Sequence, residues 1–378
     1  TRVKMVNAWV CPSPAVFDKR RTGVRATIFT EARKSHIGLP LRKSTSLRTH
    51  NASRSGANIS VIFCVSTQDD PLASKSPSFV DSLANWVLSS AFSVKPIADI
   101  LKRQARSLVV KRAQKLGYDF EKEARALKRS DVYTRKAQLK NPCVKYPEYY
   151  KVDFHTYPNG NLSWEAAFEG GVAAVSVHAT VFSPVEDPEG DRKLRQSYSD
   201  LLAKEISTPP RDVLDIGCSI GSSSFALQDL YPSATVTGLD LSPYFLAIAQ
   251  IKAEERGTAL NLVHGAAEQL PFPDQSFDLV SISLVTHELP NAPTVQMLQE
   301  AFRVLRPGGY LGIMDQNPNS EVFKRMKPFL KTLFRATEPY LEEYRQLDME
   351  NAIVKAGFTR PMFAENTPRH RTLIASRH

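Results

Sequence analysis

The stretch that decides the fold is Val213-Leu214-Asp215-Ile216-Gly217-Cys218-Ser219-Ile220-Gly221. A short apolar run bounded by glycine is typical of a buried strand in a parallel sheet. The two glycines let the backbone turn sharply and approach a ligand closely. A helix predicted for residues 222–230 would direct its N-terminal amides at that ligand. The stretch therefore predicts a nucleotide-like ligand at the carboxyl end of a strand.

The spacing of the glycines argues against a dinucleotide. The fingerprint G-x-G-x-x-G would need glycine at three positions, but here they hold Gly217, Ser219 and Ser222. Asp215 would repel a pyrophosphate and would accept hydrogen bonds from an ammonium group. A second β-rich run, residues 236–240, ends in Asp240, which lies 19 residues after Gly221. A carboxylate at that position is expected against ribose hydroxyls.

Further elements follow in an order typical of an α/β domain. Ser242-Pro243 is an expected helix start, with serine as the N-cap and proline as the first helical residue. The other expected strands and helices cover residues 194–206, 260–264, 279–283, 311–314, 340–356, 358–364 and 371–376. The last two segments are expected to form a closing β-hairpin.

The connecting segments carry two recognisable blocks. They read Gly265-Ala266-Ala267-Glu268-Gln269-Leu270-Pro271-Phe272-Pro273-Asp274-Gln275-Ser276-Phe277-Asp278 and Arg306-Pro307-Gly308-Gly309. Together with the glycine loop, these blocks resemble those of class I S-adenosylmethionine (SAM) methyltransferases. The resemblance is close to the type 11 methyltransferases, which include the C-methyltransferases of quinone biosynthesis, and it favours a plant plastid type. The resemblance covers about residues 194–315 well. It implies a Rossmann-like seven-stranded sheet with an antiparallel last strand, preceded by a helical N-terminal extension.

The same resemblance implies SAM as cofactor and a set of residues that bind it. These are Asp215, Gly217, Ser219, Gly221, Asp240, Leu241, Ala266, Ala267 and Ser283. Ser219 replaces the middle glycine of the usual motif. Ala266 stands where the family usually has an aspartate that accepts the adenine amino group. Adenine would then be held by backbone amides near Ala267 and by apolar contacts with Leu241, unless another acceptor substitutes.

The sequence indicates fewer residues for the acceptor half of the site than for the cofactor half. His287 and Asp315 follow the fourth and fifth predicted strands, so both are candidates for acid–base catalysis or acceptor positioning. A purely structural role is the alternative for each. The resemblance favours methyl transfer to a small or amphiphilic organic acceptor such as a prenylated quinone or phenol. A nucleic-acid or protein methyltransferase, or a non-catalytic SAM-binding scaffold, remain alternatives.

Charge is distributed unevenly along the chain. The net charge is +10, but residues 1–68 hold 12 Lys/Arg and 2 acids, which leaves 37 of each sign in the remainder. A basic, Ser/Thr-rich, acid-poor start is typical of an organellar transit peptide. We expect import into the chloroplast, with the mitochondrion or an ordinary disordered tail as alternatives. The neutral remainder argues against nucleic acid as a partner.

Residues 69–193 are expected to be a helical, aromatic-rich cap or lid, and residues 194–378 the methyltransferase domain. Residues 95–145 contain 15 Lys/Arg against 5 acids, so one interpretation is peripheral contact with an anionic membrane. The other is a solvated helix face. Aromatic residues gather in 146–182, which suits a wall of the acceptor pocket. No metal site is expected, because the sequence has no C-x-x-C pair. No membrane-spanning helix is expected either.

Overall fold

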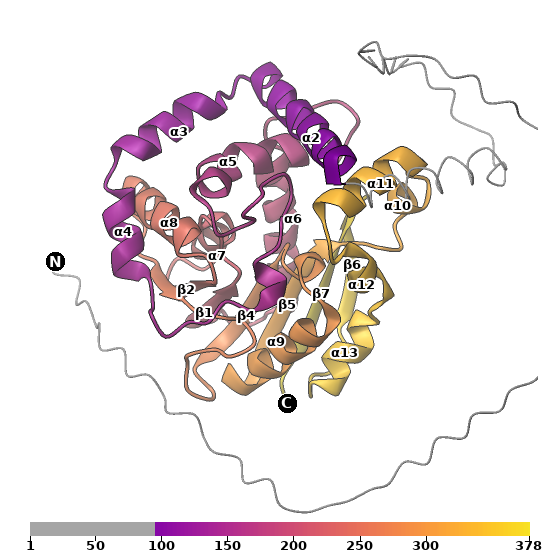
Figure 1. The fold of residues 1–378 in the computed structure, drawn as a ribbon. Helices are drawn as coiled ribbons and strands as arrows, with labels where there is room; N and C mark the ends of the chain where they lie inside the picture. Colours follow the sequence, from indigo (N-terminus) through magenta and orange to yellow (C-terminus); the bar gives the residue numbers. More distant parts are fainter. Residues whose placement is uncertain (1–94) are drawn as a thin grey trace, which may run out of the picture. The chain divides into compact units, whose positions relative to one another are not determined.

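The computed structural model describes residues 95–378, and their centre is a seven-stranded sheet (Figure 1). The strand order is β3-β2-β1-β4-β5-β7-β6, and β7 runs antiparallel to its two neighbours, whereas the other pairs are parallel. The strands are β1 (Asp212–Ile216), β2 (Thr235–Asp240), β3 (Asn261–His264), β4 (Phe277–Ser283), β5 (Leu305–Gln316), β6 (Met362–Thr367) and β7 (His370–Ser376). This arrangement confirms the predicted class I methyltransferase type of α/β fold.

The sheet is covered by helices on both faces because its strands are apolar on both. Val213 and Leu279 pack in one cluster with Leu202 of α6, whereas Leu214 and its neighbours pack in another with Leu298 of α9. Successive side chains of a strand point to opposite faces, so one apolar run supplies two cores. The covering helices are α6 (Gly190–Glu205), α7 (Ser222–Leu230), α8 (Pro243–Arg256), α9 (Asn291–Val304), α12 (Leu341–Gln346) and α13 (Met349–Lys355).

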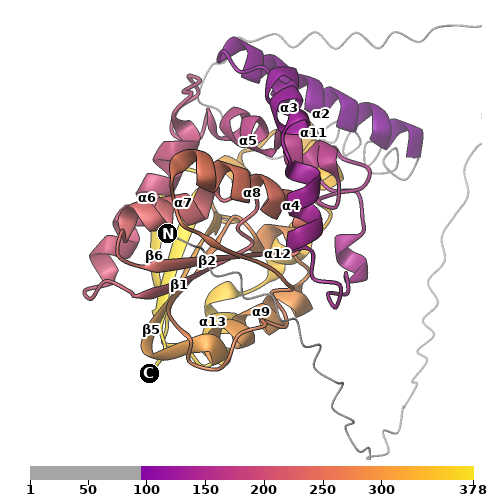
Figure 2. The same ribbon diagram turned by 90° about the vertical axis from the view of Figure 1, so that its left-hand side faces the viewer.

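Residues 95–178, here called the cap, lie against α8 and α6 (Figure 2). The cap comprises α2 (Lys95–Lys115), α3 (Phe120–Arg129), α4 (Val132–Leu139), the 3₁₀ turn η1 (Glu148–Tyr150) and α5 (Trp164–His178). Trp164 anchors it, since its ring lies 5.0 Å from that of Tyr244 on α8 and 4.9 Å from that of Tyr133 on α4. The predicted helical N-terminal region is therefore present and is packed against the methyltransferase-type sheet.

Three predicted elements have different bounds. The helix expected over 340–356 is two helices, α12 and α13, because Asp348 leaves the helical path and its carboxylate accepts a hydrogen bond from the amide of Asn351. The fifth strand begins at Leu305 rather than 311, since Leu305 already pairs with Phe277. The hairpin begins at Met362, four residues later than expected, after Phe358 has packed into the core.

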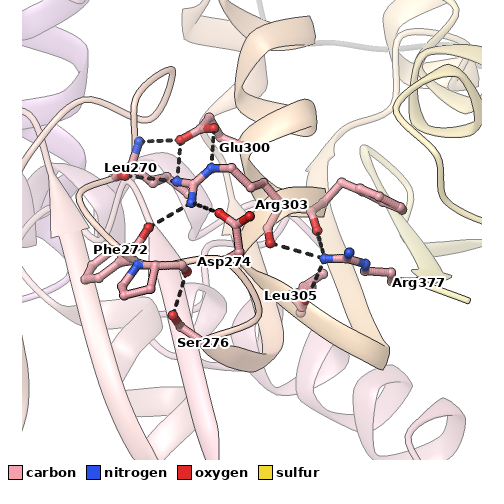
Figure 3. A network of polar contacts seen from close by, with 10 residues as sticks. Leu270, Phe272, Asp274, Ser276, Glu300, Arg303, Leu305 and Arg377 are labelled. Atoms are coloured by element: carbon pink, nitrogen blue, oxygen red, sulfur yellow. Dashed lines mark hydrogen bonds and ion pairs between the residues drawn. The ribbon is translucent and has the colours of Figure 1, made fainter. Parts of the chain in front are cut away.

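The Leu270–Ser276 segment, which carries much of the first recognisable block, is fixed by Arg303 of α9 (Figure 3). The Arg303 guanidinium donates to both carboxylate oxygens of Glu300, to Asp274 and to the carbonyls of Phe272 and Leu270. Arg377 in turn donates to the carbonyls of residues 302, 303 and 305. This block therefore has a structural role, because it secures the crossover between β3 and β4.

The remaining helices are α10 (Glu321–Lys324) and α11 (Pro328–Thr337), and α11 contacts α2 of the cap. Between residues 95 and 378 no helix has the length and apolarity to cross a bilayer. The same residues contain no cluster of acidic, histidine or cysteine side chains suited to a metal ion. The expected transit segment, residues 1–68, lies outside the described residues.

Candidate functional site

The loop after β1 makes the close turn that the sequence predicts. Gly217 has φ of +72°, and a Cβ on it would lie 2.5 Å from Cγ2 of Val285, so no other residue fits there without a shift. Gly221 has φ of +89° and starts α7. Ser219 is also left-handed, with φ of +50°, which costs a non-glycine residue about 1 kcal/mol. Its amide donates to Asp240 Oδ2 at 2.8 Å, which offsets part of that cost.

The two predicted carboxylates lie at the ends of adjacent strands and are both buried. Asp215 Oδ2 accepts hydrogen bonds of 2.6 Å from the hydroxyls of Ser223 and Ser224, so this side chain also fixes α7. Asp240 accepts from the amide of Ser219 and, at 2.7 Å, from that of Ser242. Burial raises the pKa of Asp215 to about 6 and that of Asp240 to about 7, against the hydrogen bonds that favour the charged forms.

Leu241, Ala266 and Ala267 lie beside Asp240, where β2 and β3 end. Leu241 is buried, and its carbonyl accepts a 3.1 Å hydrogen bond from Nε2 of His264. Ala266 pairs with Gln269 in an isolated bridge, and Ala267 is partly buried against the core. Glu268 is the carboxylate next to this position, and it accepts a hydrogen bond from the Tyr149 hydroxyl of the cap.

The three other predicted residues lie on the far side of β1. Ser283 is the last residue of β4, and the chain then turns through Leu284, whose φ is +59°. This turn leads into η2 (Thr286–Glu288) and brings His287 to Asp315 at the end of β5. The imidazole Nδ1 donates to Asp315 Oδ1 at 2.7 Å, and the Thr286 hydroxyl donates to Oδ2. The structure therefore brings both candidate catalytic residues into one buried pair.

The charge state of this pair limits its chemistry. Burial alone would lower the pKa of His287, but the charge and the hydrogen bond of Asp315 outweigh it and raise that pKa to about 9. Burial would likewise raise the pKa of Asp315, yet the imidazolium holds it below its ordinary value. At neutral pH the pair is imidazolium and carboxylate, so His287 acts as a hydrogen-bond donor and becomes a base only at high pH.

Part of the chain is similar to known proteins. A family described as "Methyltransferase domain" matches residues 213–309. This chain contains a class I SAM-dependent methyltransferase domain. SAM is the cofactor of this class of domain.

Individual relatives are similar over shorter stretches. Demethylmenaquinone methyltransferase of Thermus thermophilus is 35% identical over 149 residues, which are 37% of this chain and 66% of that protein. Phthiotriol/phenolphthiotriol dimycocerosates methyltransferase of Mycobacterium leprae is 33% identical over 140 residues, or 37% of this chain and 50% of that protein. A solved SAM-dependent methyltransferase of Aquifex aeolicus is 22% identical, with a TM-score of 0.41, over 50% of this chain and 93% of that one. The chain spans less than two thirds of these curated relatives.

Unpartnered polar atoms in the methyltransferase domain suit a ligand such as SAM. Asp215 Oδ1 and Ser283 Oγ are buried and have no hydrogen-bond partner among the described residues. They lie near the carboxyl ends of β1 and β4, which are adjacent parallel strands. An ammonium group and hydroxyls would satisfy atoms of this kind, and buried carboxylates favour a positively charged ligand.

The cap closes over this edge through polar contacts that the sequence did not predict. The carbonyl of Asn161 accepts from the Ser242 hydroxyl at 2.6 Å, and its side-chain amide donates to Glu288 at 3.0 Å. His155 lies between two carboxylates, 3.2 Å from Glu288 and 2.8 Å from Glu338. These carboxylates hold the pKa of His155 well above its ordinary value although burial opposes them. The adjacency of Glu288 to His287 was the only sequence signal for this cluster.

The aromatic segment 146–182 divides between two places. Tyr149 contacts Glu268 beside the cofactor side of the site, and the pKa of the half-buried Tyr150 is raised by loss of solvent and by the nearby charge of Asp240. Trp164 instead lies in the hydrophobic cluster that joins the cap to α8. Part of the segment therefore lies beside the cofactor side of the site, and part anchors the cap to α8, while its role as a wall of the acceptor pocket stays a prediction.

Proposed function

We propose that the protein transfers the methyl group of SAM to a small amphiphilic acceptor, a prenylated quinol or phenol. The observation that carries the proposal is the pair of buried carboxylates, Asp215 and Asp240, at the ends of adjacent strands around a left-handed glycine loop. SAM supplies an electrophilic methyl sulfonium, so the protein needs mainly to bind, orient and exclude water.

The acceptor side of the proposal rests on position and on the relatives. The cofactor residues occupy β2, β1 and β4, so an acceptor facing the methyl group would lie over β4, β5 and β7, beneath the cap. His287 and Asp315 lie at that edge. The curated relatives are named for demethylmenaquinone and for phenolphthiotriol-type lipids, which supports a ring-bearing, lipid-soluble acceptor.

Calorimetry with SAM tests the cofactor half. Removing the Asp240 charge should weaken SAM by about 10- to 100-fold, because a hydrogen bond to a charged group contributes roughly 1.5–3 kcal/mol. The matched control is Asp229→Ala, which removes an exposed carboxylate of α7 that pairs with Arg256. If Asp240→Ala binds SAM as tightly as the parent does, Asp240 is not a cofactor ligand.

Transfer of labelled methyl from SAM to demethylmenaquinol, and lipid profiling of a null mutant, test the acceptor half. The proposal expects one labelled product in the lipid phase and accumulation of its unmethylated precursor in the mutant. Tight SAM binding with no transfer to any quinol, phenol or lipid extract would instead favour a non-catalytic scaffold.

We also propose that the outer face of α2 contacts an anionic membrane surface, where such an acceptor resides. Exposed along this face are Arg103, Lys111 and Lys115, with Leu108 at 57% exposure between them. Vesicles with and without phosphatidylglycerol test the idea by co-sedimentation. Arg103→Glu combined with Lys111→Glu should abolish binding to the anionic vesicles, and equal binding by parent and variant would refute it.

Import into a plastid remains our proposal for residues 1–68, on their composition alone. Fusion of this segment to a fluorescent protein should direct it to plastids. A cytosolic or mitochondrial signal would contradict the proposal.

A further inference from the structure

Arg371 is a buried cation at the acceptor edge of the sheet. It lies on β7 with its Cα directly opposite that of Asp315 on β5, and it is only 7% exposed. Paired residues of neighbouring strands project to the same face of a sheet. Arg371 therefore shares the face on which Asp315 holds His287.

The guanidinium of Arg371 has few partners for a buried charge. One of its nitrogens donates to the Tyr344 hydroxyl at 3.4 Å, and the group lies 5.7 Å from the centre of the Tyr344 ring. Within residues 95–378 it forms no ion pair. The Tyr344 ring in turn lies 6.4 Å from that of His287, so the three side chains are neighbours.

Other arginines of the same region are satisfied differently. Arg377 donates to three backbone carbonyls, and Arg303 pairs with Glu300 and Asp274 (Figure 3). A guanidinium has five donors and stays charged at every physiological pH. Burying such a charge is costly unless an anion or several acceptors surround it, so the neutral Tyr344 hydroxyl leaves it incompletely paired.

We propose that Arg371 binds an oxyanion of the acceptor, the deprotonated hydroxyl of a phenol or quinol. The inference rests on the proposed function, since it takes the acceptor to lie over β4, β5 and β7. Arg371 and the His287 imidazolium provide two positively charged groups at this edge of the sheet. Asp315 does not neutralise Arg371, because it is already paired with His287. Charge-assisted hydrogen bonds from a guanidinium are strong and favour planar anions.

One other anion could use the same guanidinium, namely the carboxylate of SAM. Both ligands present a planar or resonance-stabilised oxyanion, so geometry alone does not separate them. The position of Arg371 on β7, which β4 and β5 separate from β1 and its glycine loop, favours the acceptor.

The probe for the test is 4-nitrophenol, whose phenolate absorbs visible light and whose phenol form does not. The full chain is saturated with S-adenosylhomocysteine and titrated with the probe across pH. We expect the parent to bind the phenolate in preference to the phenol and so to shift its titration to lower pH. Arg371→Met should weaken phenolate binding by roughly 10- to 100-fold, while Arg371→Lys should keep part of it.

The matched control is Arg369→Met, which removes a nearby arginine that donates to Thr180 instead. Circular dichroism reports whether each variant folds. If Arg371→Met does not fold, the test rests on the titrations of the parent and of Arg371→Lys. No preference for phenolate in the parent, or equal preference in folded Arg371→Met, would overturn the assignment.

Calorimetry with SAM separates the remaining outcomes. A loss of SAM affinity in Arg371→Met, with phenolate binding unchanged, would assign the guanidinium to the cofactor carboxylate and refute our proposal. If the parent itself fails to bind SAM, the proposed function fails. Intact SAM binding without phenolate preference leaves the proposed function in place and removes only the role of Arg371.

Discussion

Replacing His287 with asparagine tests the imidazolium–carboxylate pair at the end of β5. Asparagine can present an N–H to Asp315 where Nδ1 does now, but it carries no charge. The variant therefore removes the ion pair while keeping the hydrogen bond of 2.7 Å. Both side chains are buried, so solvent screens their interaction little.

The magnitude follows from the pKa of His287, which is raised from 6.5 to about 9. A tenfold change in proton affinity corresponds to about 1.4 kcal/mol, so the folded state gains roughly 3 kcal/mol from protonating this residue. Because the folded pKa is the higher one, the gain is complete below pH 6.5, declines as pH rises and is lost above about 9. The stability difference between parent and variant should therefore be larger at pH 6 than at pH 10 by about 3 kcal/mol.

Urea unfolding of parent and His287→Asn at both pH values measures this difference directly. Other titratable groups, among them His155 with its raised pKa, are common to both proteins and cancel in the comparison. The chemical shift of the His287 ring gives its pKa independently. An unchanged stability difference across pH, or a ring that titrates at or below 6.5, would refute the reasoning.

Three further predictions use other parts of the molecule. SAM should bind roughly tenfold more tightly at pH 8 than at pH 6, because ligand hydroxyls and positive charge favour the ionised form of Asp240, whose pKa is about 7; calorimetry that finds no pH dependence would contradict this. Arg303→Gln should lower the free energy of unfolding by about 2–3 kcal/mol, since partly exposed charged hydrogen bonds are lost, while SAM affinity stays within about twofold; urea unfolding and calorimetry check the two statements. Trp164→Ala should reduce acceptor turnover with SAM affinity nearly unchanged, because it loosens the cap from α8, and a variant with full activity would show that this anchor is dispensable.

Much of the cofactor half is encoded over short distances along the chain. Gly217 and Gly221 can be predicted as loop residues from the sequence, because the turn after β1 needs a left-handed backbone at both positions, and glycine adopts it most easily. Ser242 caps α8 through the amide of Phe245, which is three residues away. Asp215 and Asp240 are placed by the rule that parallel strands end at one edge. Local propensity and strand order thus suffice to predict this part.

The acceptor half depends on contacts that no local pattern specifies. His155 meets Glu338 across 183 residues, and Tyr149 meets Glu268 across 119. The position of His287 after a predicted strand makes it a candidate base, but its protonation is set by Asp315, which only the pairing of β4 with β5 brings within 2.7 Å. No sequence pattern marks Arg371 as a site residue, because its lack of an ion-pair partner results from tertiary packing. Hydrophobic periodicity and capping signals determine the elements, whereas burial and distance, which fix charge states, arise only when those elements pack together.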